Sequence, residues 1–149
     1  MNIEPIGTVK SPVVKPIDAN WGSVISEIHL KPEFAGGLKG LEEFSHAVIL
    51  YYIESNDFDP KNGMLRRPRG LTQMPLLGVF AQRARHRPNP IGITAVRIVE
   101  VKENVLTVKG LDAIDGTPVL DIKPYVPAYD SVAGPKVPAW VDTIMQGYF

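Results

Sequence analysis

The sequence predicts a mostly β fold, a small closed or nearly closed antiparallel β-barrel with few short helices. Apolar and β-branched residues come in short runs of strand length, and fourteen prolines and thirteen glycines separate these runs. Few segments show the apolar spacing of an amphipathic helix. Because the strands do not alternate regularly with helices, the pattern favours a closed antiparallel barrel over a doubly wound sheet.

Seven segments have the composition of strands. They are residues 3–10, 24–30, 46–53, 76–81, 93–101, 105–110 and 119–122. The fifth and sixth segments flank the short turn Lys102-Glu103-Asn104, so they should pair as an antiparallel hairpin. Helical material is limited to a turn over residues 38–44 and a segment near residues 139–146. The long connection over residues 54–75 is polar and basic, and loops of this length in a compact domain usually carry function.

The length and composition are those of one folded domain. The chain has 149 residues, of which 44% are hydrophobic and 21% charged, so a single core suffices. No apolar run approaches the roughly 20 residues of a membrane helix, and residues 1–10 lack the apolar core of a signal peptide. We therefore expect a cytoplasmic protein. With no cysteine and three scattered histidines, disulfides, thiolate zinc sites and cysteine nucleophiles are excluded, and no metal site is expected.

Charge is segregated along the chain although the net charge is zero. Residues 60–99 contain no Asp or Glu, whereas the rest of the chain carries eight cations against sixteen acids. The cations of this basic segment are Lys61, Arg66, Arg67, Arg69, Arg83, Arg85, Arg87 and Arg97. A basic stretch of this kind is typical of contact with a phosphate-bearing partner. Alternatively, the arginines pair with acids elsewhere in the fold.

Residues 78–92 form the most unusual stretch of the sequence. Three arginines alternate with small or polar residues, and two prolines then bracket Asn89. Pro88 and Pro90 fix their own φ angles and restrict the preceding residues, so the backbone from Arg87 to Pro90 should be extended and stiff. A stiff polar loop favours binding because it loses little conformational entropy when a ligand arrives. The alternative is a proline turn between strands, in which Asn89 satisfies its own backbone.

Residues 110–125 place several ionisable groups around one turn. Asp115-Gly116 is a turn signal, and Asp121 and Lys123 lie on one face of the following strand by the period of two. One interpretation is an ion pair at a sheet edge. The other is that Asp112, Asp115 or Asp121 binds a cofactor or accepts a proton.

Together these two segments resemble the signature of the TsaA-like (TrmO) family. The matching residues are Phe80, Arg83, Arg87-Pro88-Asn89-Pro90-Ile91-Gly92, Leu111-Asp112, Asp115-Gly116-Thr117-Pro118, Asp121 and Lys123-Pro124-Tyr125. Ile6-Gly7, Ser11-Pro12 and residues 40–46 match in the same order, so the resemblance spans about residues 3–130. Residues 82–84 are Gln-Arg-Ala, where the family's tRNA enzymes usually have Thr-Arg-Ser or Thr-Arg-Thr.

The resemblance implies one β-barrel domain over residues 1–149 that binds S-adenosylmethionine and forms a homodimer. It also implies a tRNA substrate, because members are similar to the enzyme that N-methylates threonylcarbamoyl-adenosine beside the anticodon. The implied cofactor residues are Phe80, Gln82, Arg83, Arg87, Pro88, Asn89, Ile91, Leu111, Asp115, Gly116, Thr117, Asp121, Lys123 and Tyr125. Those from Asp115 onward would form a wall facing the loop, either in the same subunit or across the dimer.

A sulfonium is already a good methyl donor, so the protein needs mainly to align the acceptor and exclude water. No covalent nucleophile is required. If the acceptor is an exocyclic nitrogen, a base must take its proton, and the candidates are His86, Asp112, Asp115 and Asp121. The alternatives are a methyltransferase of the same fold with another substrate, and a non-catalytic protein that binds S-adenosylmethionine or RNA.

Overall fold

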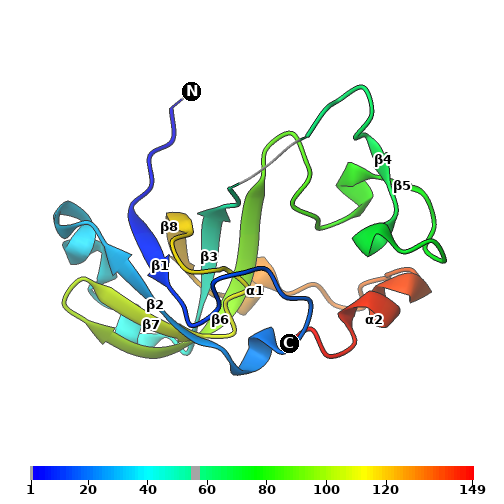
Figure 1. Ribbon diagram of the computed structural model, residues 1–149. Helices are drawn as coiled ribbons and strands as arrows, with labels where there is room; N and C mark the ends of the chain where they lie inside the picture. The colour runs from blue at the N-terminus through cyan, green and yellow to red at the C-terminus, as the bar shows by residue number, and fades with distance from the viewer. Residues whose placement is uncertain (1, 55–57) are drawn as a thin grey trace.

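Six antiparallel strands form a closed barrel in the computed structural model, which describes residues 2–54 and 58–149 (Figure 1). The strands are β1 (Gly7–Lys10), β2 (Ile25–Leu30), β3 (His46–Tyr52), β6 (Ile91–Lys102), β7 (Val105–Lys109) and β8 (Pro118–Pro124). Their order around the barrel is β1-β2-β7-β6-β3-β8, and β8 closes onto β1. The predicted fold class is confirmed.

Six of the seven predicted strand segments contribute to the barrel. The predicted hairpin is confirmed, because β6 and β7 pair antiparallel on either side of the turn. The first strand is shorter than predicted and begins at Gly7. A Cβ at Gly7 would lie 2.5 Å from the carbonyl oxygen of His29, so glycine is what lets β1 and β2 approach at this point.

The prediction of a strand over residues 76–81 is only partly right. Two residues form β5 (Leu77–Gly78), which pairs with the short strand β4 (Leu65–Arg66) outside the barrel. The next three residues form the 3-10 helix η5 (Val79–Ala81). A short apolar run is compatible with several kinds of buried segment, so its pattern alone did not distinguish them.

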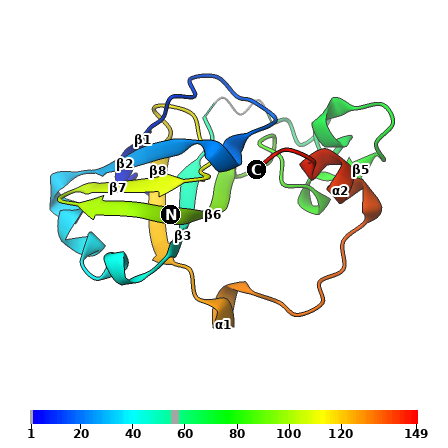
Figure 2. The ribbon, with the colours of Figure 1, turned by 90° about the horizontal axis from the view of Figure 1, so that it is seen from below.

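These elements belong to a lobe, residues 58–81, which lies beside the barrel (Figure 1). The lobe also contains the 3-10 helix η4 (Pro68–Gly70) and fills most of the predicted long connection, of which residues 55–57 lie outside the described residues. Met74 and Val79 are buried within it. The predicted C-terminal helix is confirmed as α2 (Ala139–Met145), and α2 lies next to the lobe in both views (Figures 1 and 2).

The barrel interior is filled by inward-facing residues that alternate with outward-facing ones. Fully buried side chains include Val9, Ile28, Ile49, Val96, Leu106, Val108 and Val119. Along the first half of β6 the even-numbered residues face inward and the odd-numbered ones face outward. This alternation decides which side chains of β6 reach the candidate site.

The remaining helices are short. The predicted turn over residues 38–44 coincides with the end of η2 (Pro32–Leu38) and with η3 (Leu41–Glu43), and η1 (Trp21–Ser23) and α1 (Pro127–Asp130) complete the set. Among the described residues, none of these helices has the length and apolar character needed to cross a membrane.

Candidate cofactor pocket

A pocket of about 450 Å³ lies on the outer face of the barrel, where the loop before β6 meets the start of that strand. Its lining residues are Phe80, Gln82, Arg83, Arg87, Pro88, Asn89, Ile91 and Ile93. The structure thus brings together the seven residues of the loop that sequence reasoning selected, and it adds Ile93. The volume is in the range of small-molecule sites, about 300–1,000 Å³.

The floor of the pocket is apolar. Ile91 and Ile93 face outward from β6 and remain 40% and 48% exposed, and the ring of Phe80 is 72% exposed beside them. Large apolar side chains this exposed are unusual enough to indicate a contact surface when they gather at one place. An aromatic ring with free area is also suited to stacking on a flat heterocycle.

The rim of the pocket is cationic. Arg83 Nη2 donates a hydrogen bond to the carbonyl oxygen of Ile93 at 2.6 Å, and Arg87 Nη1 donates to the carbonyl oxygen of Gln82 at 3.2 Å. A guanidinium has five N–H donors, so the bond to Ile93 fixes Arg83 while leaving most of its donors for an anionic group. Gln82 Nε2, the side-chain amide nitrogen, donates to the carbonyl oxygens of Arg66 and Leu77 at 2.8 and 3.1 Å. These hydrogen bonds attach the lobe to a residue that lines the pocket.

The proline-bracketed loop bends at residues 87–89. The backbone amide of Ile91 donates to the carbonyl oxygen of Asn89 at 2.8 Å. The backbone amide of Ile53 donates to the carbonyl oxygen of Pro90, also at 2.8 Å. Within the described part of the chain, the Asn89 side chain makes no hydrogen bond and lines the pocket. This favours a ligand-binding role over a turn in which Asn89 satisfies its own backbone.

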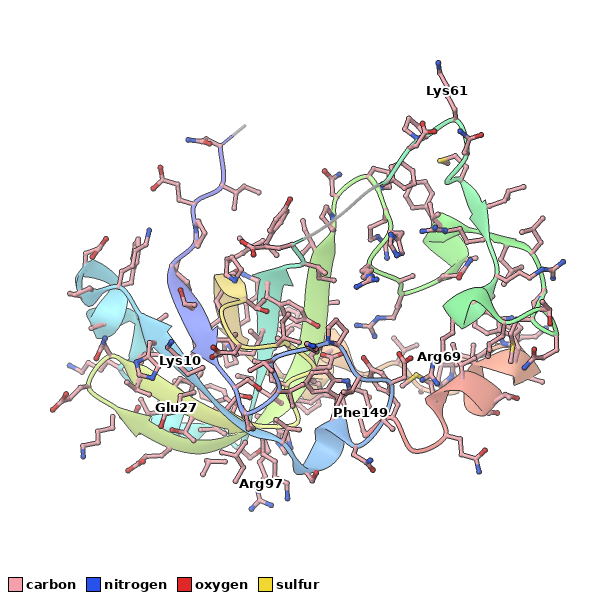
Figure 3. All side chains as sticks on the ribbon, in the orientation of Figure 1. Lys10, Glu27, Lys61, Arg69, Arg97 and Phe149 are labelled. Carbon is pink, nitrogen blue, oxygen red and sulfur yellow. The ribbon has the colours of Figure 1, made fainter. Side chains whose placement is uncertain are left out.

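Six arginines of the basic segment form no ion pair with a carboxylate of the described residues. Among residues 2–54 and 58–149, ion pairs join Glu27 to His29 and Asp121 to Lys123. The arginines outside these pairs include Arg66, Arg67, Arg69, Arg83, Arg85 and Arg97. Several of them donate to backbone carbonyls instead, which keeps their charge uncompensated. Figure 3 shows Lys61 and Arg69 on the lobe, with Arg97 on a distant part of the barrel.

Asp121 and Lys123 form an ion pair, which was one of the two interpretations of this segment, with Lys123 Nζ 2.6 Å from Asp121 Oδ2. The hydrogen bond to Asp121, and then its charge, raise the pKa of Lys123 above its usual value. In the sheet register, Leu50 of β3 lies between Ile93 of β6 and Asp121 of β8. Asp121 and Ile93 therefore lie on the same face of the sheet. Two strand spacings of about 5 Å each nevertheless separate Asp121 from the pocket floor.

The other residues of the second segment lie elsewhere within one chain. Leu111 and Thr117 are buried, and Gly116 occupies a turn with φ of 84°. Asp115 Oδ1 accepts a hydrogen bond from the Ser11 amide at 3.1 Å, which ties the turn to the chain after β1. The Tyr125 ring contacts the His46 ring edge-on, with ring centroids 6.4 Å apart. None of these residues lines the pocket.

The two remaining candidate bases, Asp112 and His86, also have described partners. The Asp112 carboxylate accepts hydrogen bonds from the hydroxyls of Tyr51 at 2.9 Å, Tyr148 at 2.8 Å, and Thr94. Arg85 Nε donates to His86 Nε2 at 3.2 Å, and neither residue lines the pocket.

The tRNA-methyltransferase O N-terminal domain is the family whose model matches this chain, over residues 9–131. The chain belongs to this family. It is 41% identical over 136 residues to an S-adenosyl-L-methionine-binding protein of Archaeoglobus fulgidus, covering 89% of this chain and 94% of that protein. It is 39% identical over 126 residues to the mouse tRNA (adenine(37)-N6)-methyltransferase, covering 85% of this chain and 28% of the mouse protein.

The fold is also that of solved members of the TrmO family. A crystal structure of TrmO from P. aeruginosa superposes with a TM-score of 0.76 at 33% identity, covering 94% of this chain and 61% of that chain. The chain therefore spans about three fifths of this TrmO and little more than a quarter of the mouse enzyme. The TrmO N-terminal domain match includes the whole pocket, whereas α2 and Tyr148 lie beyond it.

Sequence reasoning within this TrmO-type domain missed Tyr51, Thr94 and Tyr148. One available signal was Gly92, the last residue of the Arg87–Gly92 motif. A Cβ at Gly92 would lie 2.2 Å from the Tyr51 ring, so glycine at this inward-facing position lets the ring cross β6 and reach Asp112. Tyr148 had no comparable local signal, because only the fold brings residues 112 and 148 together.

Proposed function

We propose that this protein binds S-adenosylmethionine in the described pocket and transfers its methyl group to an exocyclic nitrogen of adenosine in tRNA. The observation that carries the proposal is the pocket itself, in which the Arg83 and Arg87 guanidiniums and the Asn89 amide surround an apolar floor. Relatives named for S-adenosylmethionine binding and for tRNA adenine-N6 methylation support the cofactor and the reaction.

The residues present fit this cofactor. A guanidinium suits its carboxylate by bidentate hydrogen bonding, and the Asn89 amide offers both a donor and acceptors to a ribose or amine. Phe80, Ile91 and Ile93 give an apolar surface for the adenine ring. When bound, the cofactor supplies an electrophilic methyl group.

The chain's own contribution is alignment, exclusion of water and removal of one proton. Of the four candidate bases we favour Asp121, which lies on the same face of the sheet as the pocket, and His86, which belongs to the loop that carries Arg83 and Arg87. Asp112 is held behind the pocket floor by three hydroxyls, and Asp115 is held beside the chain after β1 by the Ser11 amide. We propose threonylcarbamoyl-adenosine as the acceptor, on the strength of the family resemblance.

The lobe next to the pocket supports a tRNA substrate. Its cations Lys61, Arg66, Arg67 and Arg69 belong to the acid-free segment, and none is paired with a described carboxylate. Cations placed in this way attract phosphates and orient a nucleic acid without reading its bases. A tRNA substrate would place the protein in the cytoplasm.

We also propose that the protein acts as a homodimer through the outer face of β3, β6 and β8. Ile91 and Ile93 are exposed there, and Val48 and Leu50 beside them are half-buried. A second copy packed on this face would cover that apolar surface and could bring its residues 111–125 to the pocket. Sedimentation at micromolar concentration should then give a dimer, and a monomer would contradict this arrangement.

A protein that binds S-adenosylmethionine without transferring the methyl group is the second candidate, because the Archaeoglobus fulgidus relative is named only for binding. One experiment separates the two functions. Calorimetric titration with S-adenosylmethionine should show binding, and labelled methyl groups should then appear in bulk tRNA. Binding without transfer to any tRNA favours the second candidate, and absence of binding overturns both.

A further inference from the structure

A carboxylate held by three hydroxyls lies directly behind the pocket floor. Tyr51 comes from β3, Thr94 from β6 and Tyr148 from the segment after α2, and all three donate to Asp112. Burial, and then the negative charge of Asp112, raise the pKa of both phenols above their usual range. Both phenols therefore stay protonated and remain donors at neutral pH.

The cluster is joined to the pocket by the backbone of β6. Thr94 directly follows Ile93, whose side chain forms the floor and whose carbonyl oxygen holds Arg83. Gly92, one residue earlier, packs against the Tyr51 ring. Residues 91–93 thus carry ligand-facing groups on the outer side, and Tyr51 and Thr94 hold them on the inner side.

Tyr148 reaches this cluster from a segment that is itself well anchored. The amide of Asn20 donates to the carbonyl oxygen of Gly147 at 2.9 Å, and the amide of Trp21 donates to that of Tyr148 at 2.8 Å. A Cβ at Gly22 would lie 2.5 Å from the carbonyl carbon of Phe149, so the segment lies directly on this glycine. These contacts restrict the position of the Tyr148 side chain.

The same ring also contacts the lobe. The Arg69 guanidinium lies over the Tyr148 ring, 5.7 Å from its centroid, and Arg69 Nη2 donates to the carbonyl oxygen of Asp18 at 3.2 Å. Figure 3 shows Arg69 where the lobe faces α2, and Phe149 nearer the barrel. Tyr148 therefore connects three parts, namely the lobe, the segment at residues 18–22 and the barrel interior.

We propose that Tyr148 and Asp112 are positioning residues of the cofactor pocket. The Tyr148 hydroxyl holds the Asp112 carboxylate, and Asp112 holds Thr94 and Tyr51, so that the floor at residues 91–93 and the Arg83 side chain stay in place. The inference rests on the proposed binding of S-adenosylmethionine at this pocket. One of the two residues, Tyr148, lies outside the segment that matches the TrmO N-terminal domain.

The test compares Tyr148→Phe with Tyr129→Phe, which removes a hydroxyl from a tyrosine that is 87% exposed on α1. Tyr148→Phe keeps the ring under Arg69 and removes only the bond to Asp112. We expect the Kd for S-adenosylmethionine to rise about fivefold, which corresponds to roughly 1 kcal/mol, and we expect no change in Tyr129→Phe. A second measurement, hydrogen exchange of the amides at residues 91–94 without cofactor, should show faster exchange in Tyr148→Phe alone.

A double-variant cycle shows whether Tyr148 acts through Asp112. In the Asp112→Ala background, which leaves the Tyr148 hydroxyl no side-chain acceptor at residue 112, Tyr148→Phe should change the Kd no further. Equal affinity of Tyr148→Phe and wild type, or full additivity in the double variant, overturns the inference. If Asp112→Ala does not fold, Tyr148→Phe alone decides. If wild type itself binds no S-adenosylmethionine, the proposed function fails, and unchanged exchange at residues 91–94 then overturns the positioning role separately.

Discussion

Gly92 lies where the pocket floor and the barrel interior share one strand. Its neighbours Ile91 and Ile93 face the pocket, and the Tyr51 ring occupies the space that a side chain at residue 92 would need. The glycine of the motif is therefore explained by packing inside the barrel rather than by contact with a ligand. This separates the motif into ligand-facing residues and one residue that supports them.

The substitution Gly92→Ala tests that packing. We expect it to lower the free energy of unfolding by about 2 kcal/mol, because the added methyl group must displace the Tyr51 ring. Urea denaturation is the measurement. Gly36→Ala serves as the control, because a Cβ at Gly36 meets no atom within 4 Å and should leave stability nearly unchanged. Equal stability of the two variants would contradict the contact.

Arg87 and Asn89 test the ligand-facing part of the motif. We expect Arg87→Ala and Asn89→Ala each to weaken S-adenosylmethionine binding about tenfold, since each removes a hydrogen bond to a charged or polar group of the cofactor. Calorimetry measures the affinity, and thermal melting should show intact barrels. Arg97→Ala, on β6 but away from the pocket, should bind as wild type does. Wild-type affinity in both pocket variants would show that the loop is misassigned.

At the scale of elements, the lobe depends on Gln82 for its attachment. The Gln82 amide nitrogen bonds to Arg66 of β4 and Leu77 of β5, and the Val79 amide donates to the carbonyl oxygen of Met64 at 3.0 Å. An apolar run was enough to predict a strand over residues 76–81, but β4 offers only a two-residue partner. The run therefore ends as a 3-10 helix rather than a barrel strand.

Gln82→Ala should loosen the lobe without opening the barrel. We expect trypsin to cleave after Lys61, Arg66 or Arg69 several times faster than in wild type, because two buried hydrogen bonds are lost. Mass spectrometry of the fragments locates the cleavage sites. The control is Gln73→Ala, an exposed glutamine of the same lobe, which should be cleaved at the wild-type rate. Unchanged cleavage in Gln82→Ala would mean that other contacts hold the lobe.

At the scale of the whole molecule, charge is segregated along the chain: residues 60–99, which include most of the lobe, carry eight cations and no Asp or Glu, and the rest of the chain carries eight cations against sixteen acids. This separation predicts that tRNA binding is driven by release of counterions. We expect tRNA affinity to fall by at least about tenfold between roughly 50 and 200 mM salt, measured by filter binding.

Matched charge reversals locate that binding surface. Lys61→Glu on the lobe should weaken tRNA binding and reduce its salt dependence, whereas Lys10→Glu on β1 should have little effect, since Figure 3 shows Lys10 on another part of the molecule. A flat salt response in wild type would instead show that the basic segment does not contact phosphates.

Local periodicity and turn signals in the sequence predicted the six barrel strands and the β6–β7 hairpin, and the family resemblance pointed to the residues of the pocket loop. The Asp121–Lys123 pair was one of two interpretations that the period of the strand left open, and the structure shows it. Local pattern could not decide whether residues 111–125 reach the pocket, because strand order around the barrel places β3 between β6 and β8. The contact of Tyr148 with Asp112, 36 residues apart, was likewise decided only by the tertiary structure, since a hydrogen bond between distant residues has no periodic signature.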